Sequence, residues 1–395
     1  MDQALNPYSP GAGIRPAALV GRSTELTLID TMISRTARGL HNRGIILHGL
    51  RGVGKTVLLN EIARKAEAAD WLTVRIEATS DKKNNKHVRT RLARELTQSA
   101  RKISVRKRWK HILDILPVIN AFSTTLGFTG VSFNADIKTQ TGRGDSGVLE
   151  LDLEELVLDV SAAAHKDGKA LAFFIDEMQD LDAEMLSALI TAQHQAGQRG
   201  LPFFIFGAGL PTLPAVLAQS HSYAERLFEY RSIGALDDDA ARAALSEPAE
   251  FSGAQFTPRA LEILITAAEN YPYFLQEYGK AIWEIAVASP FTPDDAKLAI
   301  GQGTEALDQG FFPSRWERAT PAERAFLAAM ADIGHGDVSI SDIATHLGAK
   351  VTSIGTNRLH LIQKGLVYSP QHGYLRFTVP GMNEYIQRNQ DDATS

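Results

Sequence analysis

The sequence predicts an α/β fold with a doubly wound parallel sheet up to about residue 236, because short apolar runs alternate there with helical patterns. Two of these runs end in residues that suit phosphate and metal binding, at the edge where open α/β sheets bind their ligands. From there on the patterns are helical, apart from a hairpin near the end. The apolar runs are residues 44–48, 72–76, 171–175, 201–207 and 230–233.

The run at 44–48 leads into a loop that fits G-x-x-x-x-G-K-[ST], a pattern that wraps the phosphates of a nucleotide. Its glycines reach backbone angles that let successive N–H groups face an anion. We expect Lys55 to contact the β- and γ-phosphates and the Thr56 hydroxyl to bind Mg²⁺. A helical pattern at 57–68 adds the positive end of a helix dipole. The expected nucleotide-binding residues are Gly49, Leu50, Arg51, Gly52, Val53, Gly54, Lys55, Thr56 and Val57.

The run at 171–175 is apolar throughout, as in a strand that is covered on both faces, and it ends in Asp176 and Glu177. Carboxylates at the C-terminal end of such a strand lie where ligands bind. Asp176 is expected to hold the Mg²⁺ shell, and Glu177 to orient and deprotonate a water as general base. Together with the loop, these residues predict an ATPase core that uses ATP and Mg²⁺.

Composition sets wider bounds on the protein. The 395 residues suggest two or three domains, and the 44% hydrophobic and 22% charged residues are typical of a globular chain. Because the sequence has no cysteine, disulfides and thiolate metal sites are excluded. No apolar run approaches the ~20 residues of a membrane span, and the N-terminus lacks the features of a secretory signal. We therefore expect a soluble, cytoplasmic protein without a membrane partner.

The net charge of −5 hides a basic block at residues 81–110, which holds twelve Lys or Arg and two acidic residues. Such a block is typical of a nucleic-acid surface. It is equally compatible with an amphipathic helix whose cations pair with acids elsewhere in the chain, and the sequence leaves both readings open.

The chain divides into four parts by composition and pattern. Residues 1–18 are rich in Pro, Gly and Ala and predict an extended arm. Residues 19–236 form the nucleotide-binding domain, with an insertion at about 101–150 that has no assignable chemistry. Residues 237–302 predict a helical lid broken at Gly253, Pro258, Pro272 and Pro290, and a glycine-containing linker follows up to Pro313. Residues 316–390 form a third unit.

Within the nucleotide-binding domain we expect helices at 23–38, with Ser23 as its N-cap, and at 88–100 in the basic block. Further helices are expected at 151–166, 183–196 and 211–220. In the insertion, an apolar stretch at 112–126 runs into residues 127–133, which read as a strand or a hairpin.

The third unit reads as a winged helix-turn-helix, with helices at 321–333, 341–347 and 351–364 and a hairpin of strands at 366–368 and 374–379. Its third helix carries side chains that can contact phosphates and base edges of double-stranded DNA. The domain is not strongly basic, however, and winged helices also bind proteins. The DNA-contact candidates are Thr352, Ser353, Thr356, Asn357, Arg358 and Arg376.

In these strings and their order the chain resembles the AAA+ ATPases of the origin-recognition and initiator type, and the related STAND-type signalling ATPases of bacteria and archaea. The matching strings are residues 19–22, 49–56, 173–181, 224–228 and 271–276. The resemblance implies that Leu19, Val20 and Gly21 line the adenine pocket and that Pro272 belongs to the lid motif. It also implies that Arg226, or else Arg231, is the arginine finger that completes a neighbouring subunit's site.

Two positions depart from that family's pattern. The polar residue expected at the end of the fourth strand is missing from Phe206–Gly209, and Tyr273 stands where the lid usually carries an arginine. Both departures predict slow hydrolysis, or an ATP-gated switch.

The sequence therefore predicts an AAA+ ATPase whose nucleotide state controls assembly and DNA binding through the winged helix. The alternative is a STAND-like switch or adaptor that uses the same domain for protein contacts. Both readings include self-association or a partner protein.

Overall fold

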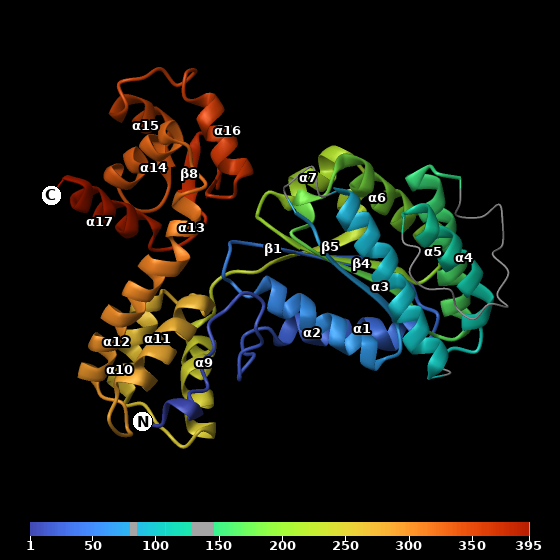
Figure 1. Cartoon of the computed structure of the whole chain (residues 1–395), viewed down its shortest axis with the longest axis horizontal. Coiled ribbons are helices and arrows are strands. Elements are labelled where there is room, and N and C mark those ends of the chain that lie inside the picture. Colours follow the sequence, from blue (N-terminus) through green and yellow to red (C-terminus); the bar gives the residue numbers. More distant parts are fainter. Residues whose placement is uncertain (80–84, 107, 128–145, 395) are drawn as a thin grey trace. The chain divides into compact units, whose positions relative to one another are not determined.

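The protein is described here from a computed structural model, which covers residues 1–79, 85–106, 108–127 and 146–394 (Figure 1). The chain forms two compact units that interleave along the sequence. The first unit comprises Met1–Gly21, Leu50–Gly54 and Gly234–Ser395, and the second comprises Arg22–Gly49 and Lys55–Ile233.

The second unit is built on a parallel five-stranded sheet in the order β2–β3–β4–β1–β5, which confirms the parallel α/β sheet of the predicted fold class. Because β4 lies between β1 and β3, the loop after β1 and the carboxylates after β3 flank the end of β4. The strands are β1 (Gly44–His48), β2 (Leu72–Glu77), β3 (Leu171–Asp176), β4 (Phe203–Gly209) and β5 (Phe228–Ser232).

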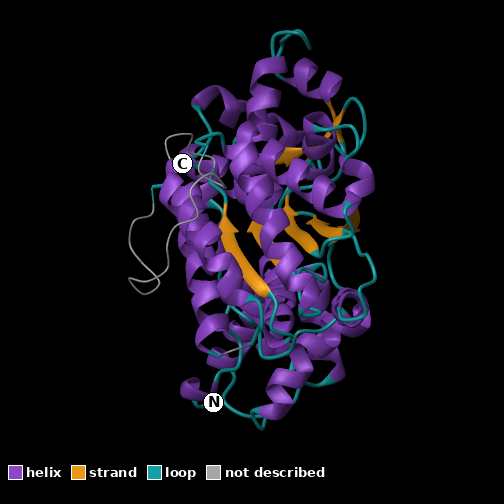
Figure 2. Cartoon of the chain, turned by 90° about the vertical axis from the view of Figure 1, so that its right-hand side faces the viewer, coloured by secondary structure: helices purple, strands orange, loops and turns teal. Residues whose placement is uncertain are grey.

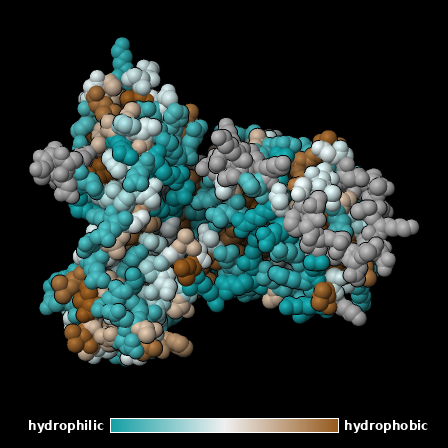
Figure 3. All heavy atoms as spheres, in the orientation of Figure 1, coloured by the Kyte–Doolittle hydropathy of each residue, from teal (hydrophilic) through white to brown (hydrophobic). Residues whose placement is uncertain are grey.

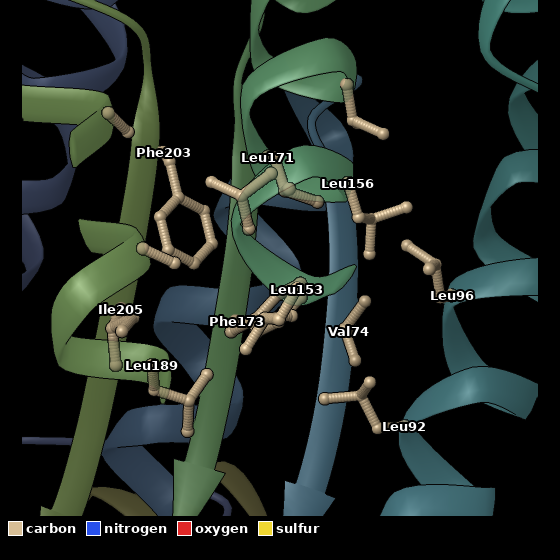
Figure 4. Packing of buried hydrophobic residues seen from close by; sticks show 14 of the residues in the cluster. Val74, Leu92, Leu96, Leu153, Leu156, Leu171, Phe173, Leu189, Phe203 and Ile205 are labelled. Atoms are coloured by element: carbon tan, nitrogen blue, oxygen red, sulfur yellow. The ribbon is translucent and has the colours of Figure 1, made fainter. Parts of the chain in front are cut away.

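Helices cover both faces of this sheet, since successive side chains of each strand point to opposite faces. On one face Val74, Phe173 and Phe203 pack with leucines of α3, α5 and α6 (Figure 4). Alternate residues turn to the other face, where Phe174 and Phe206 stack with ring centroids 4.8 Å apart. The helices are α1 (Ser23–Thr36), α2 (Lys55–Ala68), α3 (Asn85–Val105), α4 (Ile112–Thr125), α5 (Leu149–Lys166), α6 (Ala183–Gln198), α7 (Leu213–Ser220) and α8 (Ala224–Leu227).

Three local predictions need correction or fall outside the described residues. Ser23 is the first residue of α1 and not its cap, because Arg22 occupies the N-cap position without a side-chain hydrogen bond. The helix of the basic block is longer than predicted and extends over Asn85–Val105. The apolar part of the insertion is helix α4, whereas most of the strand or hairpin predicted at 127–133 lies outside the described residues.

Cations of the basic block pair with acids from other elements, as one of the two interpretations of this block expected. Arg89 of α3 lies 2.7 Å from Glu184 and 3.4 Å from Asp182, and Arg108 lies 2.8 Å from Asp70. Two arginines of the basic block therefore pair with acids of the α/β unit.

The predicted lid is a bundle of four helices, α9 (Asp238–Phe251), α10 (Pro258–Ala268), α11 (Pro272–Ile285) and α12 (Pro293–Ala306). Asp237, Thr257 and Thr292 cap three of them through their side chains. The glycine-containing linker was a wrong prediction: α12 passes through Gly301 and Gly303, and a π-helix (Leu307–Phe311) and α13 (Pro313–Trp316) follow it. Gly303 suits this helix because a Cβ there would lie 2.5 Å from the Tyr278 ring.

The N-terminal arm is packed along the lid, and most of it has no regular secondary structure. It contains a short 3₁₀ helix, η1 (Gln3–Leu5). Tyr8 is 3% exposed; its hydroxyl donates to the carbonyl of Leu245, and its ring lies against Gly279 of α11. Trp283 donates to the Asp2 carbonyl at 2.8 Å. The arm therefore completes the core of the lid.

The C-terminal module has three helices and a three-stranded antiparallel sheet in the order β6–β8–β7, followed by a further helix (Figure 2). The third helix begins at Gly355, later than predicted, so Thr352 and Ser353 lie in the turn before it. Strand β6 and helix α17 were not predicted. The elements are α14 (Pro321–Ile333), β6 (Val338–Ser339), α15 (Ile340–His346), α16 (Gly355–Gln363), β7 (Val367–Tyr368), β8 (Tyr374–Phe377) and α17 (Met382–Thr394).

Among the described residues, no helix combines the length and the apolar character that crossing a bilayer requires. The face drawn in Figure 3 is mainly hydrophilic, with apolar side chains at the lower left over the lid. Leu298 of α12, for example, is 62% exposed.

A buried carboxylate ties the elements of the C-terminal module together. Glu323 is 1% exposed and accepts hydrogen bonds from Lys364 at 2.5 Å and from the Thr320 N–H at 2.7 Å. Burial alone would raise the pKa of Glu323, but these hydrogen bonds lower it below its ordinary value. The ionised carboxylate therefore stabilises the contact of α14 with the end of α16.

We expect Glu323→Ala to lower the free energy of unfolding of this module by about 3 kcal/mol at pH 7, because Lys364 loses its buried partner. Since the folded pKa is lowered, the stabilisation is present above the unfolded pKa of about 4.3 and disappears as the pH falls through the folded pKa. Urea denaturation at pH 7 and pH 3 measures both effects. The control is Asp337→Ala, which breaks the more exposed ion pair with Arg376 and should cost at most about 1 kcal/mol. Equal costs for the two variants would contradict this account.

Candidate functional site

The predicted phosphate-binding loop connects β1, which ends at His48, to α2, which begins at Lys55. Gly52 and Gly54 have φ angles of 84° and 90°, a region that residues with a Cβ rarely adopt. The arrangement of strand, glycine loop and helix is the one that the sequence motif requires. The backbone is thus suited to turn N–H groups toward an anion at the start of α2.

Lys55 and His48 lie at the base of this loop. Lys55 is 7% exposed, and its ammonium donates to the carbonyl of Gly49 at 3.0 Å. Burial lowers the pKa of His48, and the charge of Lys55 lowers it further, which favours the neutral imidazole. Lys55 is therefore a buried cation held at the base of the loop.

Thr56 and Asp176 are in direct contact, as the sequence predicts for a pair that shares a metal ion. The Thr56 hydroxyl donates to Asp176 Oδ2 at 2.7 Å. Burial raises the pKa of Asp176, while the hydrogen bonds from Thr56 and from the Glu177 N–H oppose that rise. A hydroxyl and a carboxylate side by side offer hard oxygen ligands to a divalent cation.

Glu177 follows β3 in a left-handed backbone conformation, with a φ of 47°. This conformation is uncommon for a residue with a side chain and often marks a functional position. The Glu177 carboxylate accepts a hydrogen bond from Gln179 Nε2 at 2.7 Å. The Glu177 carboxylate, directly after β3, is therefore held by the amide of Gln179 in the turn that follows.

Gln179 is a site residue that the sequence analysis missed. Its Oε1 accepts from the Leu210 N–H at 3.1 Å, so the amide bridges Glu177 and the end of β4. A Cβ on Gly209 would lie 2.2 Å from this oxygen, so a side chain there would displace the amide. The end of β4 lacks a polar side chain of its own, as noted from the sequence, but a polar group from the neighbouring turn occupies that place. The only signal in the sequence is its position two residues after Glu177.

The two arginines predicted as finger candidates differ in their surroundings. Arg231 pairs with Glu25 at 3.1 Å and with Glu229 at 3.7 Å. Arg226 lies in α8, directly before β5, is exposed, and forms no ion pair within the described part of the chain. The structure therefore leaves Arg226 the more available of the two.

Of the other predicted nucleotide-binding residues, Gly49 and Val57 belong to the second unit. Leu19, Val20, Gly21, Pro272 and the loop residues 50–54 belong to the first. Gly52 lies against the ring of Tyr271, the N-cap of α11, and Pro272 is the first residue of that helix. Gly21, with a φ of 68°, packs against Leu236 and Ala240 at the start of α9. Leu19 and Val20 precede it and are half-buried.

The DNA-contact candidates are spread over the C-terminal module. Thr352, Ser353 and Thr356 are exposed, and Asn357 and Arg358 are half-buried on α16. Arg376 of β8 donates to Asp337 at 2.7 Å, so its charge is partly neutralised. The candidates gather around the start of α16, apart from Arg376.

Among the described residues, no group of three or more His, Asp or Glu side chains has the arrangement of a metal site made by protein alone. Mg²⁺ differs from such metals because it usually binds through one or two protein oxygens together with substrate phosphates and water. The contact between Thr56 and Asp176 has that character.

Comparisons with known proteins agree with this geometry. Residues 18–206 match the family model described as "AAA ATPase domain", and residues 309–386 match a domain of unknown function, DUF8462. A Walker-type ATPase of Pyrococcus abyssi is similar in structure over 97% of this chain and 99% of its own, with a TM-score of 0.63 and 14% identity. No curated protein matches significantly.

Two further solved structures are similar at lower TM-scores. The RuvB Holliday junction branch migration motor of Thermotoga maritima has a TM-score of 0.47 and 14% identity, covering 95% of this chain and 99% of its own. The Orc1 protein of Aeropyrum pernix, in complex with DNA, has a TM-score of 0.46 and 13% identity, covering 96% and 95%. Of these three structures, only that of the P. abyssi protein is similar enough to support a shared fold. Residues 18–206 of the chain are therefore similar to the AAA ATPase domain family, and the chain shares the fold of the P. abyssi structure.

Proposed function

We propose that the protein binds ATP with Mg²⁺ and hydrolyses it slowly, and that the bound nucleotide controls its assembly and its contacts with DNA. The observation that carries the ATP part is the hydrogen bond of 2.7 Å between Thr56 and Asp176, directly beside Lys55 in a glycine loop. These groups supply a cation for the phosphates and two oxygens for the metal.

Thr56 and Asp176 fit Mg²⁺ bound together with phosphate oxygens. When bound, the ion neutralises charge that develops on the phosphates. The raised pKa of Asp176 fits this role, because a nearby divalent cation favours the ionised carboxylate and offsets the cost of its burial.

Glu177 is the proposed general base, which orients and deprotonates the attacking water. Its hydrogen bond to Gln179 limits the directions in which the carboxylate points, and Gln179 is itself fixed by the Leu210 N–H. We assign Gln179 the positioning role that a polar residue at the end of β4 has in similar ATPases. Tyr273, in place of the lid arginine, supports slow turnover because a phenol carries no positive charge to the phosphates.

Glu177→Gln should bind ATP with nearly unchanged affinity while turnover falls by about 10²- to 10⁴-fold, because the amide cannot accept the proton of water. Calorimetric titration and a phosphate-release assay measure the two quantities separately. Lys55→Ala serves as the contrasting variant, since loss of the loop cation should abolish nucleotide binding itself. Turnover that survives in Glu177→Gln would rule out this general base.

Gln179→Ala should lower turnover about tenfold with little change in ATP affinity, because it releases the Glu177 carboxylate without removing it. The matched control is Gln198→Ala, which removes an exposed amide from the same unit. A rise in the dissociation constant for ATP equal to the fall in turnover would show that Gln179 acts on binding and not on the base.

The resemblance noted above and the surroundings of Arg226 support a role in a neighbouring copy. Arg226 is an exposed cation directly before β5, whereas Arg231 is paired with two acids. We propose Arg226 as the arginine that reaches the phosphates bound by a second subunit, which would link hydrolysis to self-association.

For the C-terminal module we propose a winged helix in which α16 is the DNA-reading helix and the β7–β8 hairpin is the wing. The exposed hydroxyls of Thr352, Ser353 and Thr356 support contacts with the DNA backbone. Against this, Arg376 and Lys364 pair with acids, which reduces the positive charge available for phosphates. The alternative function is therefore a signalling switch or adaptor, in which the same module contacts a protein.

DNA binding by about three phosphate contacts should weaken about 40-fold between 50 and 200 mM salt. Arg358→Gln should reduce the slope of log affinity against log salt by about one. The control is Arg242→Gln, an exposed arginine of the lid, which should leave the slope unchanged. Fluorescence anisotropy with duplex DNA and ATP measures these values. If the wild-type protein shows no DNA affinity at low salt, the protein-contact alternative holds.

A further inference from the structure

Arg315 of α13 is a half-buried cation. Its guanidinium lies 3.7 Å from the centre of the Phe311 ring and donates to the Phe311 carbonyl. Its Nε is buried and has no hydrogen-bond partner among the described residues, and no described acid forms an ion pair with it. One donor of the planar guanidinium is thus left unused inside the protein.

Tyr271 presents a second unused donor in the same unit. It is 2% exposed, and its hydroxyl is buried without a hydrogen-bond partner in the described part of the chain. The ring lies against the phosphate loop: a Cβ on Gly52 would be 2.8 Å from Cε1 and 3.3 Å from the hydroxyl. A buried unpaired hydroxyl costs free energy unless a ligand satisfies it.

Arg51, the residue before Gly52 in the loop, interacts electrostatically with both of these groups. Burial lowers the pKa of Arg315 to about 10, and repulsion from Arg51 contributes to the shift. The buried Nε of Arg315 and the buried Tyr271 hydroxyl are donors that a bound anion would satisfy, and the positive charge of Arg315 favours an anion over a neutral ligand.

We propose that Arg315, Arg51 and the Tyr271 hydroxyl form an oxyanion site that takes a phosphate group of the nucleotide bound by the loop. The chemistry is that of a tetrahedral oxyanion, because a guanidinium offers parallel N–H donors and the phenol adds a third direction. Phosphate is favoured over carboxylate because Arg51 belongs to the phosphate-binding loop. This assignment rests on the proposed ATP binding. It makes Arg315, in the short helix α13 before the C-terminal module, a residue that binds a phosphate of the nucleotide.

The test compares Arg315→Gln with wild type in the full chain, by calorimetric titration with ATP and by thermal unfolding without nucleotide. ATP affinity should fall about 10- to 100-fold, because a charge-assisted hydrogen bond is lost. The melting temperature of the nucleotide-free protein should stay equal or rise, since an uncompensated buried charge is removed. Arg318→Gln, which changes an exposed neighbour, is the matched control and should bind ATP within about twofold of wild type.

Tyr271→Phe gives a second and gentler variant. It removes only an oxygen without a hydrogen-bond partner, so the folded protein should keep its stability while ATP affinity falls about three- to tenfold. Unchanged ATP affinity in both Arg315→Gln and Tyr271→Phe would overturn the inference and leave the proposed ATP binding intact. A variant that melts at a lower temperature without nucleotide, but gains as much in melting temperature from ATP as wild type does, would also overturn the inference. Such a result indicates a purely structural role.

Two further results separate this inference from the proposed function. If wild-type protein does not bind ATP at all, the proposed function fails and the inference with it. If inorganic phosphate alone stabilises wild type and Lys55→Ala equally, and ATP does not displace it, the cluster takes a free anion and the assignment to nucleotide is overturned. Competition of ATP with phosphate in wild type, lost in Arg315→Gln, supports the inference.

Discussion

The parallel pairing of β3, β4 and β1 is the constraint on which the site depends. Because all three strands run in one direction, the loop after β1 and the carboxylates after β3 emerge at the same edge. The hydrogen bond between Thr56 and Asp176 joins residues that are far apart in the sequence, and only this strand order brings them together. The buried phenylalanines that fill both faces of the sheet hold that order in place.

The arginine side chains have different surroundings in different parts of the molecule. Arg89, Arg108 and Arg231 pair with acids at the surface of the α/β unit, and such pairs contribute modestly to stability. Arg315, in contrast, lies over the Phe311 ring, and no acid in the described part of the chain forms an ion pair with it. The cost of an unpaired buried charge is large enough that its persistence needs an explanation, whereas an exposed ion pair needs none.

Much of the fold could be predicted from the sequence because the apolar runs and the glycine loop are strong local signals. The strands, the loop, Asp176 and the breaks between the lid helices all follow from short-range patterns. The predictions failed where contacts between residues distant in the sequence determine the local structure. Gly303 reads as a breaker but lies in a helix, where the Tyr278 ring fills the space that a side chain would take. Gln179 and Arg315 could not be found for the same reason, since nothing near them in the sequence shows which groups they meet.

The close approach of Gln179 to Gly209 makes two positions on separate elements depend on each other. A side chain at 209 would displace the amide, and a shorter residue at 179 would leave a gap over the strand end that such a side chain could fill. Residues 179 and 209 should therefore change together among natural variants of this protein. A long amide at 179 should accompany glycine at 209, and a short residue at 179 should accompany a small polar residue at 209. Covariation between positions 179 and 209 would show which variants carry the polar group at the end of β4 and which carry it in the turn after β3.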